Sequence, residues 1–382
     1  MTGPLAGLRV LELGALGPSA YATMLLADLG AEVVRVDRPA VDAQGTEAMD
    51  PALDFLNRGK QSVAIDLKHP DAAEAVLTLV ENAQIVTEGY RPGVAERLGL
   101  GPDACLARNP ALVYARMTGW GQDGPLAAMA GHDINYISLT GALHAVGPAD
   151  GPPVPPVNFV GDWGGGGMYL VAGVLAALRE AERSGTGQVV DVAIVDGVLH
   201  MLSSLHSLLA QGLWVDERGA NALDGAAPYY GVYETADGEH MAVGAGEVKF
   251  YARLVAALGL DLPVERQYDR GHWSEARAVL ADAFRARTRT EWTAFFADID
   301  CCVTPVLSLR ESAEHPHVRA RGSVVDRDGR LHSGPAPRFS RSTAAEPTAP
   351  PVPGQHTVEV LAAAGLDPAA LIDAGVAVSR AD

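Results

Sequence analysis

Residues 5–39, LAGLRVLELGALGPSAYATMLLADLGAEVVRVDRP, contain two apolar runs separated by a helical pattern. Leu8–Leu13 and Glu32–Asp37 are short and rich in leucine or valine, which is typical of strands buried in a parallel sheet. Tyr21–Leu29, between them, predicts a helix that Ser19 could cap. A strand, a helix and a second strand in this order indicate a βαβ unit.

The alternation of strand and helix patterns continues to about residue 192 and predicts a parallel α/β sheet with right-handed crossovers. A Gly-rich turn, GDWGGGG at 161–167, precedes an apolar helical pattern. The expected strands are Val63–Asp66, Ile85–Glu88, Val113–Met117 and Gln188–Val192, and the expected helices are Pro70–Glu81, Met168–Glu182 and Ile194–Gln211.

The pattern changes in the later part of the chain. Short strands and helices up to about residue 325 predict a smaller α+β unit. Residues 335–355 are rich in proline and predict an extended connection over the surface. The expected elements are Tyr229–Tyr233, His240–Gly244, Lys249–Leu258 and Trp273–Arg287, followed by a last helix at Val358–Gly365.

Composition limits the class of protein. The 382 residues, 48% hydrophobic and 20% charged, fit a globular chain of two domains. The net charge of −18 argues against nucleic acid as a partner, because phosphate backbones require a basic surface. The three cysteines lack disulfide or zinc-site spacing, which fits a reducing cytoplasm. Residues 1–20 lack a signal-peptide pattern, and no apolar run reaches the ~18 residues of a membrane span.

One short segment of this acidic chain is basic. Arg58, Lys60 and Lys68 lie within eleven residues, and the whole chain has only three lysines. The segment could bind a small anion, or it could be a solvated loop; the sequence favours neither.

The turn after the first strand matches a dinucleotide-binding fingerprint only in part. Gly14 and Gly17 follow the strand, and Asp37 stands about 20 residues further on. The G-x-G-x-x-G spacing is absent, and Pro18 restricts the backbone where a pyrophosphate would approach. A tight strand-to-helix turn is therefore favoured over a nicotinamide site.

Three further residues are candidates for acid–base chemistry. His132 lies in GHDINY at 131–136, Asp162 in the Gly-rich turn, and Glu247 in GAGE at 244–247. Each has an ordinary alternative: a structural histidine, a helix cap, and a carboxylate that complements a helix dipole. Taken singly, none of them determines a function.

Together with their surroundings, these motifs resemble the α-methylacyl-CoA racemases of the type III CoA-transferase superfamily. The resemblance runs along nearly the whole chain, and the histidine motif is its racemase-specific part. The matching stretches are PLAGLRVLELG at 4–14, LLADLGAEVVRVDRP at 25–39, NRGKQSVAIDLK at 57–68, EGYRPGVAERLGL at 88–100, YARMTGWGQDGP at 114–125, AGHDINYISLTG at 130–141, GDWGGGG at 161–167, APYYGVYETADG at 227–238, GEVKFY at 246–251, CVTPVL at 302–307 and GQHT at 354–357.

The resemblance implies a fold and an assembly. We expect an α/β protein with a doubly wound, Rossmann-like large domain, 1–190 with 335–382, that binds CoA. A smaller α+β domain, 225–325, is joined to it by linkers at 191–224 and 326–334. Two such chains form an interlaced homodimer in this superfamily.

The resemblance also implies roles for individual residues. His132 and Asp162 are the two acid/base residues, Glu247 positions the histidine, and Tyr230 lies near the aspartate. No metal and no separate cofactor is implied, because CoA is part of the acyl-CoA thioester substrate. The residues that correspond to CoA contacts are Arg38, Ala64, Ile65, Asp66, Leu67, Lys68, Arg91, Gly131, Asp133, Ile134, Asn135 and Tyr136.

The implied reaction inverts the α carbon of a 2-methylacyl-CoA by 1,1-proton transfer through an enolate, which needs an acid and a base on opposite faces of that carbon. The alternative is a type III CoA-transferase that uses Asp162 as an acyl-accepting nucleophile. His132 favours the racemase, because a transferase needs no second proton carrier. Val248, Lys249 and Gly231 depart from the family's pattern near the site. Branched fatty acyl, sterol side-chain, arylpropionyl and natural-product thioesters are all candidate substrates.

Overall fold

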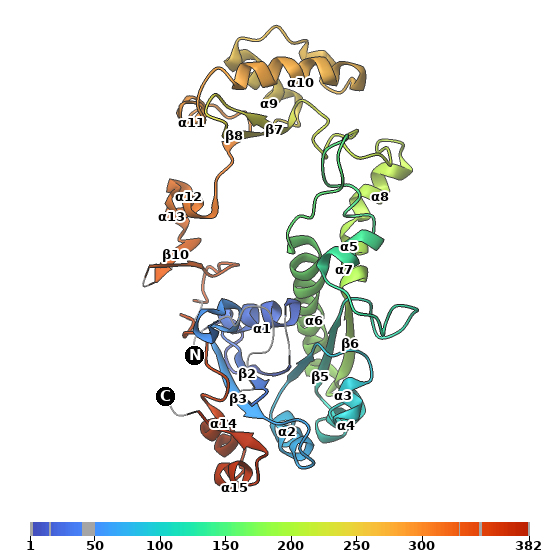
Figure 1. Cartoon of the computed structure of the whole chain (residues 1–382), viewed down its shortest axis with the longest axis vertical. Coiled ribbons are helices and arrows are strands. Elements are labelled where there is room, and N and C mark those ends of the chain that lie inside the picture. Colours follow the sequence, from blue (N-terminus) through green and yellow to red (C-terminus); the bar gives the residue numbers. More distant parts are fainter. Residues whose placement is uncertain (1–2, 15–16, 40–49, 328, 344–345, 381–382) are drawn as a thin grey trace. The chain divides into compact units, whose positions relative to one another are not determined.

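The computed structural model describes residues 3–14, 17–39, 50–327, 329–343 and 346–380 and divides into two compact units (Figure 1). Unit 1 comprises Met1–Thr140, Val157–Met201 and His332–Asp382, and unit 2 comprises Gly141–Pro156 and Leu202–Leu331. Each unit has a sheet and a hydrophobic core of its own.

Unit 1 contains a seven-stranded sheet with the order β12-β3-β2-β1-β4-β5-β6. Every pairing is parallel except that of β12 with β3. The order 3-2-1-4-5-6 is that of the Rossmann fold, in which the strand order reverses between β1 and β4. The strands are β1 (Arg9–Leu13), β2 (Glu32–Asp37), β3 (Lys60–Ile65), β4 (Ile85–Glu88), β5 (Val113–Thr118), β6 (Gln188–Ala193) and β12 (Ala377–Val378). The expected large parallel sheet is confirmed.

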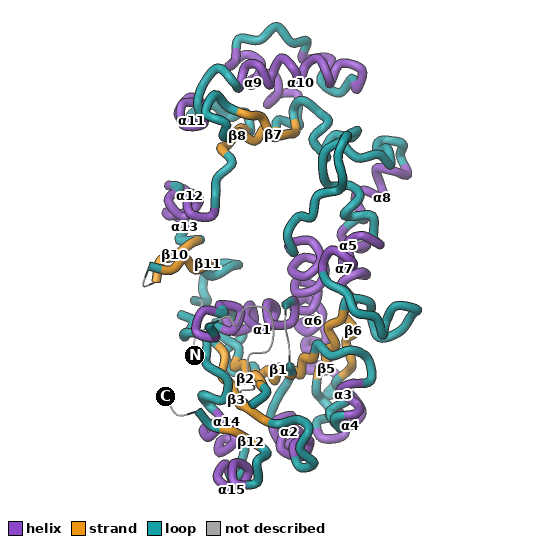
Figure 2. The backbone as a smooth tube through the Cα atoms, viewed as in Figure 1, coloured by secondary structure: helices purple, strands orange, loops and turns teal. Residues whose placement is uncertain are grey.

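Helices cover both faces of this sheet (Figure 2). On one face α1 packs against α6, and on the other α2, α4 and α14 enclose the main core. The helical segments of unit 1 are α1 (Pro18–Asp28), α2 (Ala72–Glu81), α3 (Val94–Arg97), α4 (Pro102–Arg108), α5 (Asp133–Leu139), η3 (Phe159–Met168), α6 (Tyr169–Ser184), α7 (Ile194–Met201), α14 (Thr357–Ala363) and α15 (Pro368–Asp373). No helix in the described ranges is long and apolar enough to cross a membrane.

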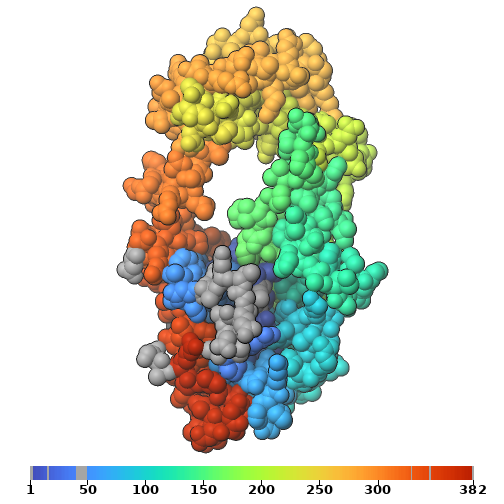
Figure 3. Space-filling view, in the orientation of Figure 1, coloured from blue at the N-terminus to red at the C-terminus, as the bar shows by residue number. Residues whose placement is uncertain are grey.

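The C-terminal segment of the chain packs beside β3 at the edge of the unit 1 sheet (Figure 1). Its residues, red in Figure 3, lie beside residues of the N-terminal part, blue in the same view. The buried Thr357 hydroxyl accepts the Ala64 N–H at 3.1 Å and donates to the Val378 carbonyl at 2.8 Å. One side chain thus connects β3, α14 and β12, so residues far apart in sequence complete the same sheet.

Unit 2 is built around a three-stranded antiparallel sheet with helices packed against it, which confirms the smaller α+β unit expected from the sequence. Its core is aromatic: Phe284 lies 5.2 Å from Tyr233 and 5.4 Å from Trp292, measured between ring centroids. Its main elements are α8 (Ser203–Ala210), β7 (Tyr230–Glu234), β8 (His240–Gly244), α9 (Val248–Leu258), α10 (Arg270–Phe284), α11 (Arg289–Phe296) and β9 (Val303–Pro305); α12 (Leu309–Glu314) and α13 (Pro316–Arg321) follow, and β10 (Val324–Arg327) pairs with β11 (Arg330–Ser333).

Several expected helix bounds are wrong, including those of the first helix and of Ile194–Gln211. The first helix begins at Pro18, not Tyr21, because proline at the first position has a preset φ and needs no N–H partner there. Gly17 is therefore the capping residue, and Ser19 lies buried inside the helix. The expected helix Ile194–Gln211 is two helices, α7 and α8, interrupted at Leu202. Residues 15 and 16, in the turn weighed as a dinucleotide fingerprint, lie outside the described residues.

Two cations of the basic segment 58–68 are buried in internal ion pairs. Lys60 is 1% exposed, and its ammonium donates to Glu12 Oε2 at 2.8 Å. Arg58 Nε donates to Asp28 Oδ1 at 3.0 Å. Burial lowers the pKa of Lys60, and the negative charge of Glu12 opposes that shift. Neither cation belongs to a solvated loop or is free to bind an anion.

Replacing Lys60 by Met should lower the free energy of unfolding by about 3–5 kcal/mol, because the buried Glu12 carboxylate then loses the cation that contacts it at 2.8 Å. Adding Glu12→Gln should restore part of the loss, since the remaining buried group is neutral. Urea unfolding of both variants measures the two effects. Equal stability of Lys60→Met and the unmodified protein would contradict a structural role for this pair.

Candidate active site

The candidate site of unit 1 is a pocket of about 450 Å³ at the carboxyl ends of β1, β4 and β5. In open α/β sheets, ligands bind in the crevice where the strand order reverses, which here lies between β1 and β4. The loops after these strands form the wall, together with α1, α5, η3 and α7. Five residues singled out from the sequence line it: Arg91, Gly131, His132, Tyr136 and Asp162.

His132 stands where the long loop after β5 turns into α5. It is the capping residue of that helix, with an extended backbone (φ −130°, ψ 174°), and its N–H donates to Asn135 Oδ1 at 3.0 Å. The residue is exposed. This cap holds the backbone of His132 while its imidazole lies at the pocket wall.

Asp162 lies half-buried on η3. Its carboxylate Oδ2 accepts a hydrogen bond from Asn158 Nδ2 at 3.2 Å. Burial raises the pKa of the Asp162 carboxyl, the negative charge of Asp133 raises it further, and Asn158 and His132 oppose the shift. Asp162 can therefore hold a proton at a higher pH than a surface aspartate.

The Gly-rich stretch is helical, which corrects the expected turn. Residues 161–167 belong to η3, a wide π-helical segment that continues into α6. A Cβ on Gly167 would lie 2.6 Å from the Tyr21 ring of α1, and one on Gly197 would lie 1.9 Å from the Gly165 carbonyl. The glycines let η3 pack between α1 and α7, so this close packing positions Asp162.

Tyr136 forms another part of the pocket wall. Its hydroxyl donates to the Gly131 carbonyl, and its ring meets Trp120 edge-on with centroids 4.8 Å apart. A Cβ on Gly119 or Gly131 would collide with the Tyr136 ring. Burial raises the pKa of Tyr136, the negative charge of Asp162 adds to this, and Arg91 opposes it. The tyrosine is thus held protonated and close to the charged groups of the pocket.

Arg91 lies in a loop that buried charges hold in place. Glu88, at the end of β4, accepts the Tyr90 N–H at 2.6 Å and Arg116 Nε at 2.8 Å. Arg116 also donates to Glu96 Oε1 at 2.8 Å. Sequence reasoning missed Glu88 and Arg116. The signal was present, because a charged residue inside an apolar strand is nearly always paired.

The remaining residues predicted to contact CoA do not line this pocket. Arg38 is exposed after β2, near enough to Tyr90 to oppose the raised pKa of that phenol. Ala64 and Ile65 are buried in β3, Asp66 and Leu67 are half-buried, and Lys68 is exposed. Asp133, Ile134 and Asn135 form the first turn of α5. Their contacts with CoA stay predictions.

Glu247 and Tyr230 belong to unit 2, so their predicted association with His132 and Asp162 stays a prediction. Glu247 caps α9 and is exposed, and Tyr230 begins β7 opposite Gly244. The buried Gln267 amide donates to the Ala245 and Gly246 carbonyls at 3.1 and 2.8 Å. These bonds hold the backbone just before Glu247, a contact that sequence reasoning missed because Gln267 follows about 20 residues later.

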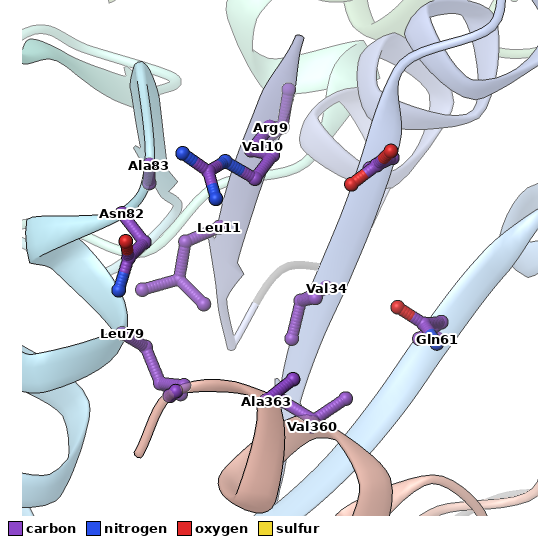
Figure 4. Close-up of a pocket in the computed structure, with 12 residues that line it drawn as sticks. Arg9, Val10, Leu11, Val34, Gln61, Leu79, Asn82, Ala83, Val360 and Ala363 are labelled. Carbon is purple, nitrogen blue, oxygen red and sulfur yellow. The ribbon is translucent and has the colours of Figure 1, made fainter. Parts of the chain in front are cut away.

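A second cavity of about 190 Å³ lies between β1, β2, α2 and α14 (Figure 4). Leu11, Val34 and Leu79 provide its apolar surface, with Arg9 and Asn82 beside them. None of the residues predicted for catalysis or CoA binding lines it.

Comparisons with known proteins extend over both units. The family model described as CoA-transferase family III matches residues 5–357. Alpha-methylacyl-CoA racemase of Mus musculus is 44% identical over 361 residues, covering 94% of this chain and 92% of that protein. The human protein of that name is 40% identical over 363 residues, with coverage of 94% and 92%. A CAIB/BAIF family protein from Brucella suis has a crystal structure with TM-score 0.81 and 26% identity, covering 95% of this chain and 100% of that one.

Proposed function

Because the chain belongs to CoA-transferase family III and is similar along nearly its whole length to α-methylacyl-CoA racemases, we propose that it is a racemase of 2-methylacyl-CoA thioesters. The observation that carries this proposal is the presence of His132 and Asp162 on one pocket at the switch point of the sheet. An imidazole and a carboxyl beside one cavity are the two proton carriers that inversion of a carbon requires.

The chemistry follows from the acidity of the α hydrogen. Its removal leaves an enolate in which the thioester oxygen shares the negative charge. From one enantiomer, neutral His132 takes the proton while protonated Asp162 delivers one to the opposite face; from the other enantiomer the roles reverse. The raised pKa of Asp162 supports its part as an acid. Positioned proton transfer contributes roughly 10²–10⁴-fold to such a rate.

The enolate oxygen needs hydrogen-bond donors, and backbone N–H groups of the Gly-rich stretch 161–167 are one candidate source. Two of its N–H groups are already used within the protein. That of Asp162 donates to Asp133 Oδ2 at 2.7 Å, and that of Trp163 donates to the Asn158 carbonyl at 3.3 Å. These two N–H groups are therefore not free to bind the enolate oxygen.

Arg91 and Arg38 support the binding of an anionic CoA by a chain of net charge −18. We propose that Arg91 meets a CoA phosphate at the pocket, and that Arg38 and residues 64–68 contribute further contacts. The large domain, 1–190 with 335–382, is the CoA-binding part in this proposal, and 225–325 is the small domain. Proton transfer of this kind needs no metal and no cofactor besides the substrate's own CoA.

An interlaced homodimer is also part of the proposal. Unit 1 exposes large apolar side chains on elements that contact one another: Leu139 on α5, Phe159 on η3, and Leu199 and Met201 on α7. Such a surface is typical of a protein–protein contact. Light scattering should give twice the mass of one chain, and a monomer would contradict the assembly.

All three cysteines are free, which supports the cytoplasm as location.

The reaction type is tested in D₂O without any acceptor acid. A single enantiomer of a 2-methylacyl-CoA should gain deuterium at C2 and yield both enantiomers, observed by mass spectrometry and chiral chromatography. Turnover that requires a free carboxylic acid would instead favour the CoA-transferase, with Asp162 as the acyl-accepting nucleophile.

Replacing Arg91 by Ala should raise KM for the acyl-CoA by about 10–100-fold, the effect of losing one or two charge-assisted hydrogen bonds. The kcat should change little, because a phosphate contact is equally strong in the ground and transition states. Arg97→Ala removes an exposed cation of α3 that does not line the pocket and is the matched control. An unchanged KM with a collapsed kcat would contradict the anchoring role.

A further inference from the structure

Asp133 connects the two proposed proton carriers. It follows His132 directly in the chain, and its carboxylate Oδ2 accepts the backbone N–H of Asp162 at 2.7 Å. The residue is 6% exposed. Its carboxylate therefore lies inside the protein, where it contacts the element that bears Asp162.

The packing around this carboxylate is close. A Cβ on Gly161 would lie 2.4 Å from Asp133 Oδ2, so only glycine leaves room for it there. The Asp162 N–H belongs to the first turn of η3, where backbone donors lack partners within the helix. Asp133 supplies that partner from α5 and so joins α5 to η3.

The second oxygen of this carboxylate, Oδ1, is buried and has no hydrogen-bond partner in the described part of the chain. A buried carboxylate that is only half satisfied is unfavourable for stability. An asparagine would provide the same acceptor for the Asp162 N–H without burying a charge. The presence of aspartate instead of asparagine at position 133 therefore indicates that the negative charge itself has a function.

We propose that Asp133 is a positioning residue for proton transfer: its carboxylate fixes the backbone of Asp162, and its negative charge favours the protonated form of the Asp162 carboxyl. The inference rests on the proposed function, in which Asp162 must carry a proton in half of the cycle. Asp133 itself does not exchange protons with the substrate in this proposal.

The charged and titratable groups around Asp162 come from three places. On α5 and at its cap lie Asp133, Tyr136 and His132, and the loop after β4 contributes Tyr90 and Arg91. The α1 and α7 residues that line the pocket, Pro18 and Ile194, carry no titratable group. Asp133 is the group among these whose negative charge raises the pKa of Asp162, while His132 lowers it.

The test compares Asp133→Asn, which keeps an acceptor oxygen but removes the charge, with Asp133→Ala, which removes both. The readout is the pH dependence of deuterium incorporation at C2. In both variants the acid limb should move to lower pH, because a lower pKa of Asp162 shifts the onset of its ionisation downward. Asp133→Ala should lose additional rate at every pH, because the Asp162 N–H has lost its partner.

A merely structural Asp133 would give a different pattern: lower rate or stability in both variants with the acid limb unmoved, and this result would overturn the inference. Asp103→Asn, which removes one exposed charge from α4, is the matched control and should leave the profile unchanged. If Asp133→Ala does not fold, Asp133→Asn still decides the question. If the unmodified enzyme shows no exchange without an acceptor acid, the proposed function fails instead, before the variants are compared.

Discussion

Asp162→Ala should lower the rate of racemisation by about 10²–10⁴-fold, the contribution of one positioned proton carrier. Inversion of the α carbon requires a group on each face, so His132 alone cannot complete it. His132 can still take a proton from the face it meets and return a deuteron from solvent to the same face. The variant should therefore incorporate deuterium slowly into one enantiomer with retention of configuration.

The measurement follows deuterium at C2 for each enantiomer of a 2-methylacyl-CoA, supplied separately in D₂O. Asp123→Asn removes an exposed carboxylate from the loop after β5 and is the control for a change of charge. Racemisation by Asp162→Ala at the unmodified rate would contradict the role of Asp162. Exchange of both enantiomers at equal rates would show that a single base reaches both faces.

The sheet of unit 1 was largely predictable because its strands are short runs of apolar residues. Glu32–Asp37 and Ile85–Glu88 in unit 1, and His240–Gly244 in unit 2, have the expected bounds. Four strands escaped prediction and have two to four residues each: Val303–Pro305, Val324–Arg327, Arg330–Ser333 and Ala377–Val378. So short a segment has no pattern of its own and is a strand only because a neighbouring strand pairs with it.

The Gly-rich stretch 161–167 shows a different reason why a sequence-based prediction can fail. Glycine disfavours a helix because of its conformational freedom, so GDWGGGG predicted a turn. In the structure the lack of side chains permits contact with α1 and α7, and that packing outweighs the local preference. A sequence read locally contains no information on the distance between two helices.

For the candidate site too, the sequence identified some of the residues and missed others. Arg91, His132 and Asp162 were singled out from their motifs, and they meet on one pocket although they follow or precede different elements. The partners that hold them were missed: Glu88 with Arg116, and the carboxylate of Asp133. Each is a charged residue buried by tertiary packing. The apolar strands around Glu88 and Arg116 indicated that these charges are paired, but the identity of each partner depends on tertiary contacts that the sequence does not show.

His132→Ala should reduce racemisation by a similar ~10²–10⁴-fold, but it should reverse the preference seen in exchange. Asp162 is then the surviving base, and it meets the opposite face of the α carbon. The variant should incorporate deuterium into the enantiomer that Asp162→Ala does not exchange. Because burial raises the pKa of Asp162, this exchange should weaken as the pH falls through that pKa, where the carboxylate becomes protonated and stops acting as a base.

A further variant tests Glu247, the carboxylate proposed to position His132. Glu247→Gln should impair exchange of the enantiomer that His132 serves and leave the Asp162 face nearly unchanged, because the resemblance assigns Glu247 to positioning the imidazole. Enantiomer-resolved exchange of the three variants, His132→Ala, Asp162→Ala and Glu247→Gln, decides the assignment. If each face of the α carbon meets one proton carrier, His132→Ala and Asp162→Ala must exchange opposite enantiomers. If both exchange the same enantiomer, one of the two residues has only a structural role.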